Sequence, residues 1–558
     1  MYGPISDLIP SSPVFEMYPL GFLTMTSYLE ERGLEVRIVN LALKMMNDRR
    51  FDVPAFLAKL HPKAFGIDLH WLPHAHGALE VAKLIKAIHP QTPMIFGGLS
   101  ATYFHRELIA YPQVDYVLRG DAVEPPLYDL LTALAAGSPL DQVPNLTWKS
   151  GGQVRVNPHT FRPDSLDYVD LRPDRIGQMV LRYRDLEGVL PFNGWWQNPI
   201  TAVFTVKGCA HGCITCGSST SACAVLGTRM QPVFRSPANL VKNLRDISRF
   251  SRGPIFLVGD LRQAGDAYAH EVLHLLRQAK IKNQIVFELF EMPPLDYLHA
   301  IDAAVQNWSL ELSPESHDPV LRRIQNEAVD DANAEMERVI QEALALRCHR
   351  IDVFFMIGLS GQTRESVMET VRYCEHLFQI SDKRLSCFIS PMGPFLDPGS
   401  RGFEEPARYG YRQFARTLEE HRQLLVQPSW KQILSYETAW MDREAIVAAT
   451  YDAGEALNAL KMRYGRIDAA QGQAVAARIA QSRALKQQLD RLEQGGAPDP
   501  GLWAALQGEI HAFSVSTVCD KRELFWRRHL VNFRLRGILW MVGGYLVGLL
   551  RRLRRRTP

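Results

Sequence analysis

Three cysteines stand close together in the segment KGCAHGCITCGSS, which covers residues 207–219. They are Cys209, Cys213 and Cys216, and their thiols could bind a metal, form disulfides or pack as small apolar side chains. Eight cysteines in 558 residues are too few for a disulfide scaffold. Three ligands do not close a tetrahedral zinc site, and no second CxxC lies nearby. A [4Fe–4S] cluster usually takes four thiolates, so three would leave one iron open to a non-protein ligand.

A parallel barrel would position this loop. The loop follows the strand-like segment ITAVFTVKG, and about six strand-like segments alternate with helical ones up to residue 400. Ligand sites in such barrels lie at the carboxyl ends of the strands. Gly208, Gly212 and Gly217 would let the chain wrap a cluster. We therefore predict an α/β fold with a partial (β/α) barrel that carries the cysteines at the mouth of its first strand.

A second alternating pattern precedes the barrel and predicts a Rossmann-like parallel sheet. Its strand-like segments are EVRIVN (35–40) and residues 64–70, 93–98 and 114–120. A helical pattern opens the chain with no strand before it, so either the sheet lacks a strand or the chain begins late. Ligands of such sheets lie at the carboxyl ends of the strands. Those ends carry Asp68, His70, Gly97, Gly98, Ser100 and Gly120.

The rest of the chain reads as a linker, a helical region and a basic tail. The tail has 14 uncharged residues at 537–550 and five arginines within 551–556. This stretch is too short to span a bilayer, but it suits an interfacial anchor on anionic lipid; the alternative is a helix packed on this chain or a partner subunit. The expected parts are a Rossmann-like domain (1–140), a linker containing a hairpin (141–198), the barrel (199–400), a helical domain (401–510) and the tail (511–558).

Composition sets the class of protein and its compartment. The chain is 46% hydrophobic and 22% charged, as in globular proteins, and its net charge of +3 argues against nucleic-acid binding. The opening MYGPISDLIP has no features of a secretory signal. We expect a cytoplasmic protein, with peripheral contact at the inner membrane face through residues 537–558.

The cysteine loop resembles that of radical S-adenosylmethionine (SAM) enzymes, whose CxxxCxxC motif holds a [4Fe–4S] cluster with SAM on the open iron. Thr215 stands where that family often has an aromatic residue beside the adenine. Three further stretches, FLVGDL, LELSPESHDPVLRRI and FFMIGLSGQTRESV, are similar to strand-end motifs of the family, although each alone could be an ordinary barrel turn. The resemblance implies SAM contacts from Gly259, Asp260, Glu315, Ser316, Arg323 and Gly358, with Gly361 beside them.

The N-terminal stretches PLGFLTMTSYLEERGLEVRIVNL and MIFGGLSATYFHRELIAYPQVDYVLRGDAVEPPLYDLL resemble the cobalamin-binding domain of B12-dependent radical SAM proteins. The resemblance covers roughly residues 10–400. It implies that the six strand-end residues named above hold cobalamin. The DxHxxG motif that supplies an axial histidine in some cobalamin proteins is absent after the first strand, so we expect base-off cobalamin without a protein histidine ligand. His70, His74 and His76 are interpreted as polar lining.

The resemblance implies cleavage of SAM to a 5′-deoxyadenosyl radical and cobalamin-dependent methylation of an unactivated carbon, with an electron donor such as flavodoxin or ferredoxin. Two alternatives stay open: a cobalamin-dependent rearrangement or cyclisation without methyl transfer, and a B12 sensor with a structural cluster. The C-terminal part resembles a subgroup without an agreed substrate. Asp397 and Tyr436 could face that substrate or serve as capping residues, and the apolar basic tail hints at a lipid-like molecule.

Overall fold

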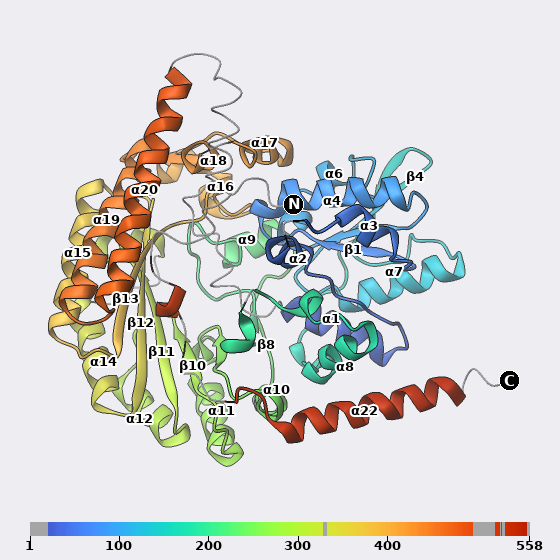
Figure 1. Ribbon diagram of the computed structural model, residues 1–558, viewed down its shortest axis with the longest axis horizontal. Coiled ribbons are helices and arrows are strands. Elements are labelled where there is room, and N and C mark those ends of the chain that lie inside the picture. The colour runs from blue at the N-terminus through green and yellow to red at the C-terminus, as the bar shows by residue number, and fades with distance from the viewer. Residues whose placement is uncertain are drawn as a thin grey trace.

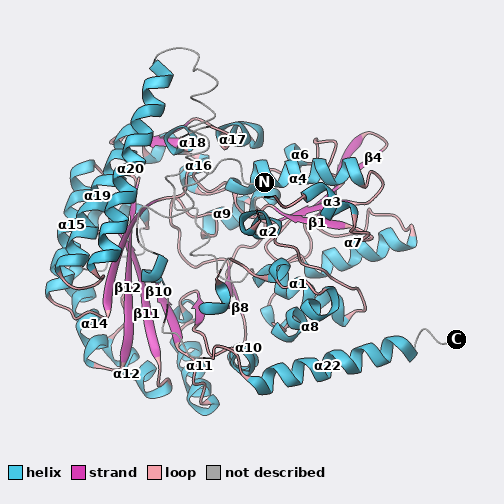
Figure 2. Cartoon of the chain, viewed as in Figure 1, coloured by secondary structure: helices cyan, strands magenta, loops and turns pink. Residues whose placement is uncertain are grey.

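The computed structural model describes residues 20–48, 50–192, 194–326, 332–427, 429–494, 519, 521–524, 526 and 531–554. Within these residues two units stand side by side, each built on a parallel sheet (Figure 1). The first unit is coloured blue to cyan, and the second, from green to orange, contains the larger sheet. Figure 2 shows the larger sheet with helices along its outer side. The expected start of the first unit, residues 1–19, lies outside the described residues.

The first sheet has the strand order β1-β2-β3-β4-β5. Its first three strands are parallel, and a hairpin adds two antiparallel strands to β3. The expected hairpin is therefore present, but it belongs to this sheet, which extends past the boundary expected at residue 140. The strands are β1 (Phe65–Asp68), β2 (Met94–Gly97), β3 (Tyr116–Leu118), β4 (Leu146–Ser150) and β5 (Gln153–Val156).

The segment EVRIVN forms no strand, contrary to the prediction from its alternating pattern. Its backbone partners lie outside the sheet: the N–H of Ile38 points to Met179 Sδ at 3.1 Å, and the N–H of Asn40 donates to the carbonyl of Gly188 at 2.7 Å. Contacts with the segment between the two sheets, which contains Met179 and Gly188, thus replace strand pairing. The helices of this unit are α1 (Leu20–Glu31), α2 (Leu41–Asn47), α3 (Val53–Ala58), α4 (Ala75–Ile88), α5 (Leu99–Tyr103), α6 (His105–Leu108) and α7 (Glu124–Ala136), with the short η2 (Leu72–His74).

The second sheet confirms the partial barrel. Its order is β13-β12-β11-β10-β9-β6, and each neighbouring pair is parallel. The strands are β6 (Thr201–Phe204), β9 (Ile255–Val258), β10 (Ile285–Leu289), β11 (Trp308–Glu315), β12 (Cys348–Ile357) and β13 (Leu385–Pro391). The helices between them are α9 (Thr220–Val225), α10 (Pro237–Phe250), α11 (Asp266–Ala279), α12 (Leu295–Ala304), α13 (Pro319–Gln325), α14 (Asn333–Ala345) and α15 (Arg364–Gln379), with η6 (Leu261–Ala264).

Strand alternation separates the core from the barrel interior. On β12, Val353 and Phe355 are buried in the main hydrophobic core under the helices. Asp352 and Phe354, which alternate with them along the strand, point to the other face. There Phe354 stacks on Phe388 of β13 with ring centroids 5.2 Å apart. The residues that follow the strand ends are therefore presented on a rigid, well-packed layer.

Short elements connect the two sheets. A two-stranded ribbon of β7 (Val206–Lys207) and β8 (Val233–Phe234) flanks the cysteine loop on both sides in sequence. The segment between the units contains η3 (Leu166–Tyr168), α8 (Pro173–Tyr183), η4 (Glu187–Val189) and η5 (Trp195–Gln197).

The C-terminal region is helical, as predicted, and covers the β13 edge of the barrel through α19. Its elements are α16 (Arg401–Glu404), η7 (Pro406–Tyr409), β14 (Tyr411–Gln413), α17 (Leu418–Leu424), α18 (Trp430–Ile433), β15 (Tyr436–Thr438), α19 (Arg443–Arg463), α20 (Ala469–Gln494), η8 (Lys521–Leu524) and α22 (Leu535–Arg554).

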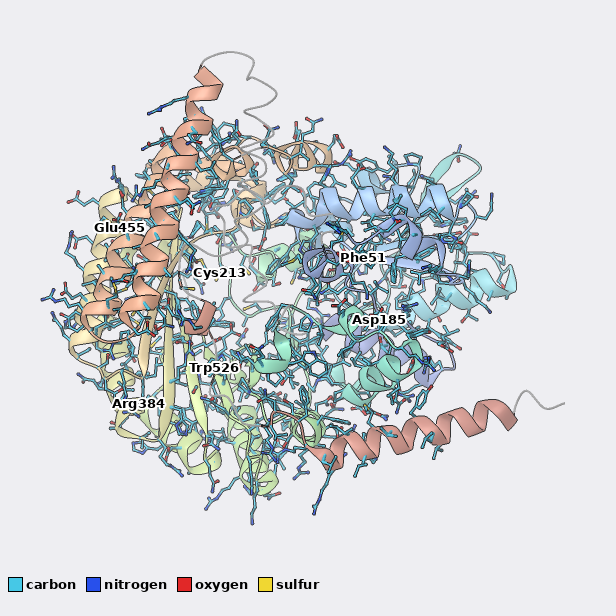
Figure 3. All side chains as sticks on the ribbon, in the orientation of Figure 1. Phe51, Asp185, Cys213, Arg384, Glu455 and Trp526 are labelled. Carbon is cyan, nitrogen blue, oxygen red and sulfur yellow. The ribbon has the colours of Figure 1, made fainter. Side chains whose placement is uncertain are left out.

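Part of the predicted tail packs against the barrel. Trp526, labelled in Figure 3, lies edge-on to Phe256 with ring centroids 5.2 Å apart. The guanidinium of Arg350 lies 4.5 Å from the Trp526 ring centre, and Lys461 forms a buried 2.6 Å ion pair with Glu523. These contacts lie near the amino ends of the strands, at the end of the barrel opposite to the cysteines.

Candidate functional site

The cysteine loop follows β7 at the carboxyl end of the barrel. Cys209, Cys213 and Cys216 are free thiols and partly buried, and Cys213 lies between the two units in Figure 3. Backbone N–H groups point toward the sulfurs, with distances of 3.5 Å from His211 N to Cys209 Sγ and 3.4 Å from Ser218 N to Cys216 Sγ. Such N–H···S contacts stabilise thiolates in iron–sulfur sites.

Electrostatics show that the three thiols share one environment. Burial raises the pKa of Cys213, and the charges of Glu315, Cys216 and Cys209 raise it further. Burial raises the pKa of Cys216 to about 12, with Asp397 as the next largest contribution. Three thiolates can persist in this pocket only beside a cationic group, which is what a bound iron cluster supplies.

The loop supplies three thiols, one fewer than a [4Fe–4S] cluster usually takes. Within the described part of the chain, no three His, Cys, Asp or Glu side chains gather around the position of one metal ion. A four-iron cluster is larger than one ion and holds its thiolates further apart. The donor set of three thiols, their N–H contacts and their shared pocket are therefore consistent with a [4Fe–4S] cluster.

Two side chains from elsewhere in the barrel hold the loop. The carboxylate of Asp397 accepts the N–H of Gly217 at 2.8 Å, and a Cβ added at Gly217 would lie 2.9 Å from the Asp397 Cβ. On the other side, Gln263 Oε1 accepts the N–H of Ala210 at 2.9 Å and lies 3.2 Å from Cys209 Sγ. Asp397 thus contacts the loop beside the third cysteine, and its role toward a substrate stays a prediction.

The predicted SAM residues at β9 lie at the barrel mouth. Gly259 has φ +95°, and an added Cβ would lie 2.5 Å from a methyl of Val206, so this position requires glycine. Its N–H donates to Glu288 at 2.7 Å. The carboxylate of Asp260 is occupied, since it pairs with Arg262 at 2.6 Å. A contact of Asp260 with SAM stays a prediction.

Glu315 ends β11 beside the cysteine loop. It has φ +62°, a left-handed conformation that is costly for a residue with a side chain and is often found at functional sites. Burial raises its pKa to about 7. Ser316 is fully buried, and its Oγ accepts the N–H of Asp318 at 3.1 Å, so it serves as a local cap. Arg323 is exposed, whereas its neighbour Arg322 is buried, and the contacts of Ser316 and Arg323 with SAM stay predictions.

Gly358, at the end of β12, lies against two tyrosines. An added Cβ there would lie 2.9 Å from the hydroxyl of Tyr436, and the hydroxyl of Tyr411 donates to the Gly358 carbonyl at 3.3 Å. Tyr436 is fully buried, and its hydroxyl has no hydrogen-bond partner among the described residues. A Cβ at Gly361 would lie 2.9 Å from Leu321. Tyr436 therefore borders one of the predicted SAM positions, and a contact with substrate stays a prediction.

The strand-end loops of the first sheet meet as predicted. Gly98 has φ +112°, and an added Cβ would lie 2.6 Å from the backbone N of His70. Ser100 is buried, and its Oγ donates to the His70 carbonyl at 2.8 Å. The N–H of Gly120 donates to Thr102 Oγ1 at 2.9 Å. These contacts hold the loops to one another, and direct contact of their residues with a corrin stays a prediction.

His70 lies at the edge of this surface nearest to the cysteine loop. Its side chain reaches solvent, as does that of Asp68, while Gly97 is half-buried. Loss of surrounding water lowers the pKa of His70 to about 4, and the charges of His74 and Lys207 lower it further. His70 is therefore neutral at pH 7 and close to Lys207, which directly precedes the cysteine loop.

Asp121 joins the two sets of loops. It follows Gly120 in the first unit, and its carboxylate accepts two hydrogen bonds from Arg229, at 2.6 and 2.7 Å. Its carbonyl accepts a hydrogen bond from Lys207 Nζ. The Arg229 and Asp121 side chains are only 6% and 16% exposed. The cysteine loop and the strand ends of the first sheet are thus fixed to each other through Asp121, by its main-chain carbonyl to Lys207 and by its carboxylate to Arg229.

A row of carboxylates crosses the barrel interior below the mouth. Glu288, Glu311 and Asp352 are register partners on neighbouring strands. Burial, followed by the charges of Asp352 and Glu288, raises the pKa of Glu311 well above its usual range. Arg350 pairs with Asp352 at 2.7 Å. Sequence reasoning missed this row, although the inward positions of the predicted strands could have indicated it.

Other site residues were missed because they are distant in sequence. Gln263 and Glu288 lie on separate repeats, and nothing in their local sequence points to the cysteine loop. Asp121 and Arg229 are 108 positions apart. Only the predicted meeting of the strand ends could have suggested that Asp121 faces the second unit.

Comparison with known proteins supports the interpretation of the first unit as a cobalamin-binding domain and finds relatives that extend beyond it. Residues 8–126 match the family model of the B12 binding domain. The hopanoid C-3 methylase of Methylococcus capsulatus is 24% identical over 321 residues, which cover 53% of this chain and 56% of the methylase. This chain therefore spans about half the length of that relative.

Two solved structures have the same fold. One is the radical SAM methyltransferase TsrM from Kitasatospora setae with cobalamin and a [4Fe–4S] cluster bound: TM-score 0.57, 16% identity, 81% of this chain and 87% of that chain. The other is the cobalamin-dependent SAM radical enzyme OxsB with aqua-cobalamin and SAM bound: TM-score 0.52, 14% identity, 97% of this chain and 78% of that chain. These likenesses establish the fold.

Proposed function

We propose that this chain, which carries a B12-binding domain and has the fold of cobalamin-dependent radical SAM enzymes, is a radical SAM methyltransferase that methylates an unactivated carbon. Cys209, Cys213 and Cys216 would hold a [4Fe–4S] cluster, and SAM would occupy the mouth of the barrel beside Gly259, Glu315 and Gly358. Cobalamin would lie against the loops that contain His70, Gly98 and Gly120. An electron donor such as flavodoxin or ferredoxin would reduce the cluster.

When bound, these groups supply the difficult chemistry: reductive cleavage of SAM to a 5′-deoxyadenosyl radical, and delivery of a methyl group from cobalamin. The chain's own part is positioning. Asp397 and Gln263 hold the cysteine loop at its two ends. Glycine at position 259 leaves room for Val206, just before the cysteine loop, and Glu288 fixes that backbone through its N–H.

The observation that carries this proposal is the junction at Asp121. A methyl group or radical can pass between two cofactors only if both face one reaction space. The ion pair with Arg229 and the hydrogen bond from Lys207 bring the predicted cobalamin surface against the predicted cluster loop. A B12 sensor with a purely structural cluster would have no need for this juxtaposition.

The same surface indicates whether the chain would supply a histidine ligand to bound cobalamin. His70 lies close to Lys207, and its low pKa leaves the ring neutral and able to coordinate. His70 nevertheless stands in the loop that follows β1, and Gly98 packs directly on its backbone. This packing holds the loop in place without any bond from the His70 ring to cobalt. We expect cobalamin to bind base-off without a protein histidine ligand, and its absorption spectrum would be unchanged by His70→Ala.

The test is the fate of the SAM methyl group. Anaerobically reconstituted protein, reduced and supplied with methyl-labelled SAM, should transfer label to cobalamin and form 5′-deoxyadenosine. Formation of 5′-deoxyadenosine without any labelled cobalamin or product would instead support the rearrangement or cyclisation. Binding of SAM without turnover would contradict an enzymatic role.

A further inference from the structure

The C-terminal helix α22 packs along the outside of the molecule with one narrow face. In Figure 1 it extends from the end of α10 past α8 and beyond the body of the protein. A Cβ added at Gly537 would lie 2.2 Å from the carbonyl oxygen of Arg249, so the backbones touch there. Met541 packs equally closely against Gly177 of α8. The docked face of α22 is thus defined by positions 537 and 541.

The opposite face of α22 is apolar and uncovered. At 3.6 residues per turn, Leu535, Leu539, Val542 and Leu546 form one stripe directly opposite to the docked face. Leu535 is 69% exposed, Leu539 61% and Leu546 52%. Trp540 lies beside the docked face, half exposed, with one side of its ring against Phe250. An exposed row of large apolar side chains on an ordered helix indicates a surface that is covered in use.

The charged residues of this segment are all of one sign. Residues 531–558 contain seven arginines and no acidic residue. The whole chain has a net charge of only +3, so the remainder of the protein is net negative. The arginines of α22 and its end therefore contrast with a net negative remainder of the chain.

We propose that α22 docks the protein on an anionic phospholipid bilayer and lies in the plane of the headgroups. The stripe from Leu535 to Leu546 would enter the acyl boundary, Trp540 would lie at the interface, and the arginines would contact phosphates. The stripe is only about 17 Å long, which is shorter than the roughly 30 Å hydrocarbon core of a bilayer. No helix in the described part of the chain combines enough length with enough apolar character to cross a membrane.

A second copy of the chain fits this surface less well. Parallel pairing of two α22 stripes would bring the arginines of 551–556 together, and antiparallel pairing would place them toward Arg534 and Arg536 of the other copy. No acidic residue in this segment offsets either arrangement, and like charges at close range are destabilising. A bilayer containing anionic lipid neutralises the arginines and covers the leucines at the same time. Because α22 contacts α8 and α10 and not the barrel mouth, the docking would hold the protein at the membrane without forming part of the predicted reaction site.

The test uses the full-length protein with vesicles of phosphatidylcholine, alone or mixed with phosphatidylglycerol. Wild type should sediment with the mixed vesicles and much less with phosphatidylcholine alone, and added salt should weaken the binding. Leu539→Glu removes one buried apolar contact and adds a negative charge, so it should weaken binding about tenfold or more. Val154→Glu, at a 43% exposed position on β5, is the matched control and should bind like wild type.

Equal binding by wild type and Leu539→Glu, or no binding by wild type, would overturn the proposal. A wild-type dimer that Leu539→Glu converts to a monomer, with no vesicle binding by either protein, would overturn it in favour of self-association. Circular dichroism of the variants establishes that each remains folded. None of these readouts depends on SAM or cobalamin, so the outcome is separate from that of the proposed reaction.

Discussion

The Asp121–Arg229 ion pair should be the main electrostatic link between the two units. Asp121→Asn leaves the Arg229 guanidinium, whose side chain is 6% exposed, without its countercharge. Breaking a buried ion pair by removal of one partner costs about 3–5 kcal/mol, and the partial exposure of Asp121 places this pair near the lower value. For a unit of about 150 residues, about 3 kcal/mol corresponds to a fall in melting temperature of roughly 6–12 °C.

The assay is a double-mutant cycle followed by thermal unfolding. Asp121→Asn and Arg229→Gln should each destabilise, and the double variant should lose clearly less than the sum of the two because no unpaired charge remains. Methyl transfer from SAM to cobalamin should fall more than cleavage of SAM, since only the transfer needs both cofactor surfaces in place. Additive losses in the cycle, or single variants that melt like wild type, would refute the role of this pair.

Three further predictions concern the surfaces around the site. Gly98→Ala should cost about 1–3 kcal/mol and reduce cobalamin retention, because its Cβ would meet the backbone of His70; Gly66→Ala on β1, where an added Cβ has nothing within 4 Å, is the control, and equal effects would contradict this. Glu311→Gln should raise the melting temperature more at pH 8 than at pH 5: the pKa of Glu311 is raised in the folded state, so wild-type stability falls as the pH rises through that pKa, and a pH-independent gain would contradict the reasoning. Gln263→Leu should lower the iron content after reconstitution, because it removes the acceptor that fixes the Ala210 N–H beside Cys209, whereas Gln278→Leu on the outer helix should not; equal iron content in the two variants would contradict this.

Local sequence was sufficient for most of the architecture. The partial barrel was predicted because strong apolar strands alternate with amphipathic helices, and the cysteines lie at the predicted strand end. The prediction of a strand at EVRIVN was wrong because backbone N–H groups of this segment point to Met179 Sδ and the Gly188 carbonyl and not to a neighbouring strand. The hairpin was predicted correctly, but its attachment to β3 is a long-range pairing that local pattern does not encode.

Side-chain roles at the site were predicted less completely. The cysteine spacing, together with its place after a barrel strand, predicts a cluster at Cys209, Cys213 and Cys216, and this assignment stays a prediction. Asp260 and Ser316 were expected to contact SAM, but their polar atoms also form local caps and ion pairs, which short polar side chains at helix starts commonly do. Gln263 and Asp121 could not be found, because their contacts depend on how separate repeats come together in space.

The central claim is that the three cysteines hold a cluster that cleaves SAM. The most direct test compares wild type with Cys209→Ala/Cys213→Ala/Cys216→Ala and with Cys223→Ala, a buried thiol on the adjacent α9. After anaerobic reconstitution and reduction, wild type and Cys223→Ala should contain iron and sulfide in the ratio of a [4Fe–4S] cluster and should form 5′-deoxyadenosine from SAM. The triple variant should do neither. A triple variant that keeps the cluster, or a loaded wild type that never forms 5′-deoxyadenosine, would contradict the account.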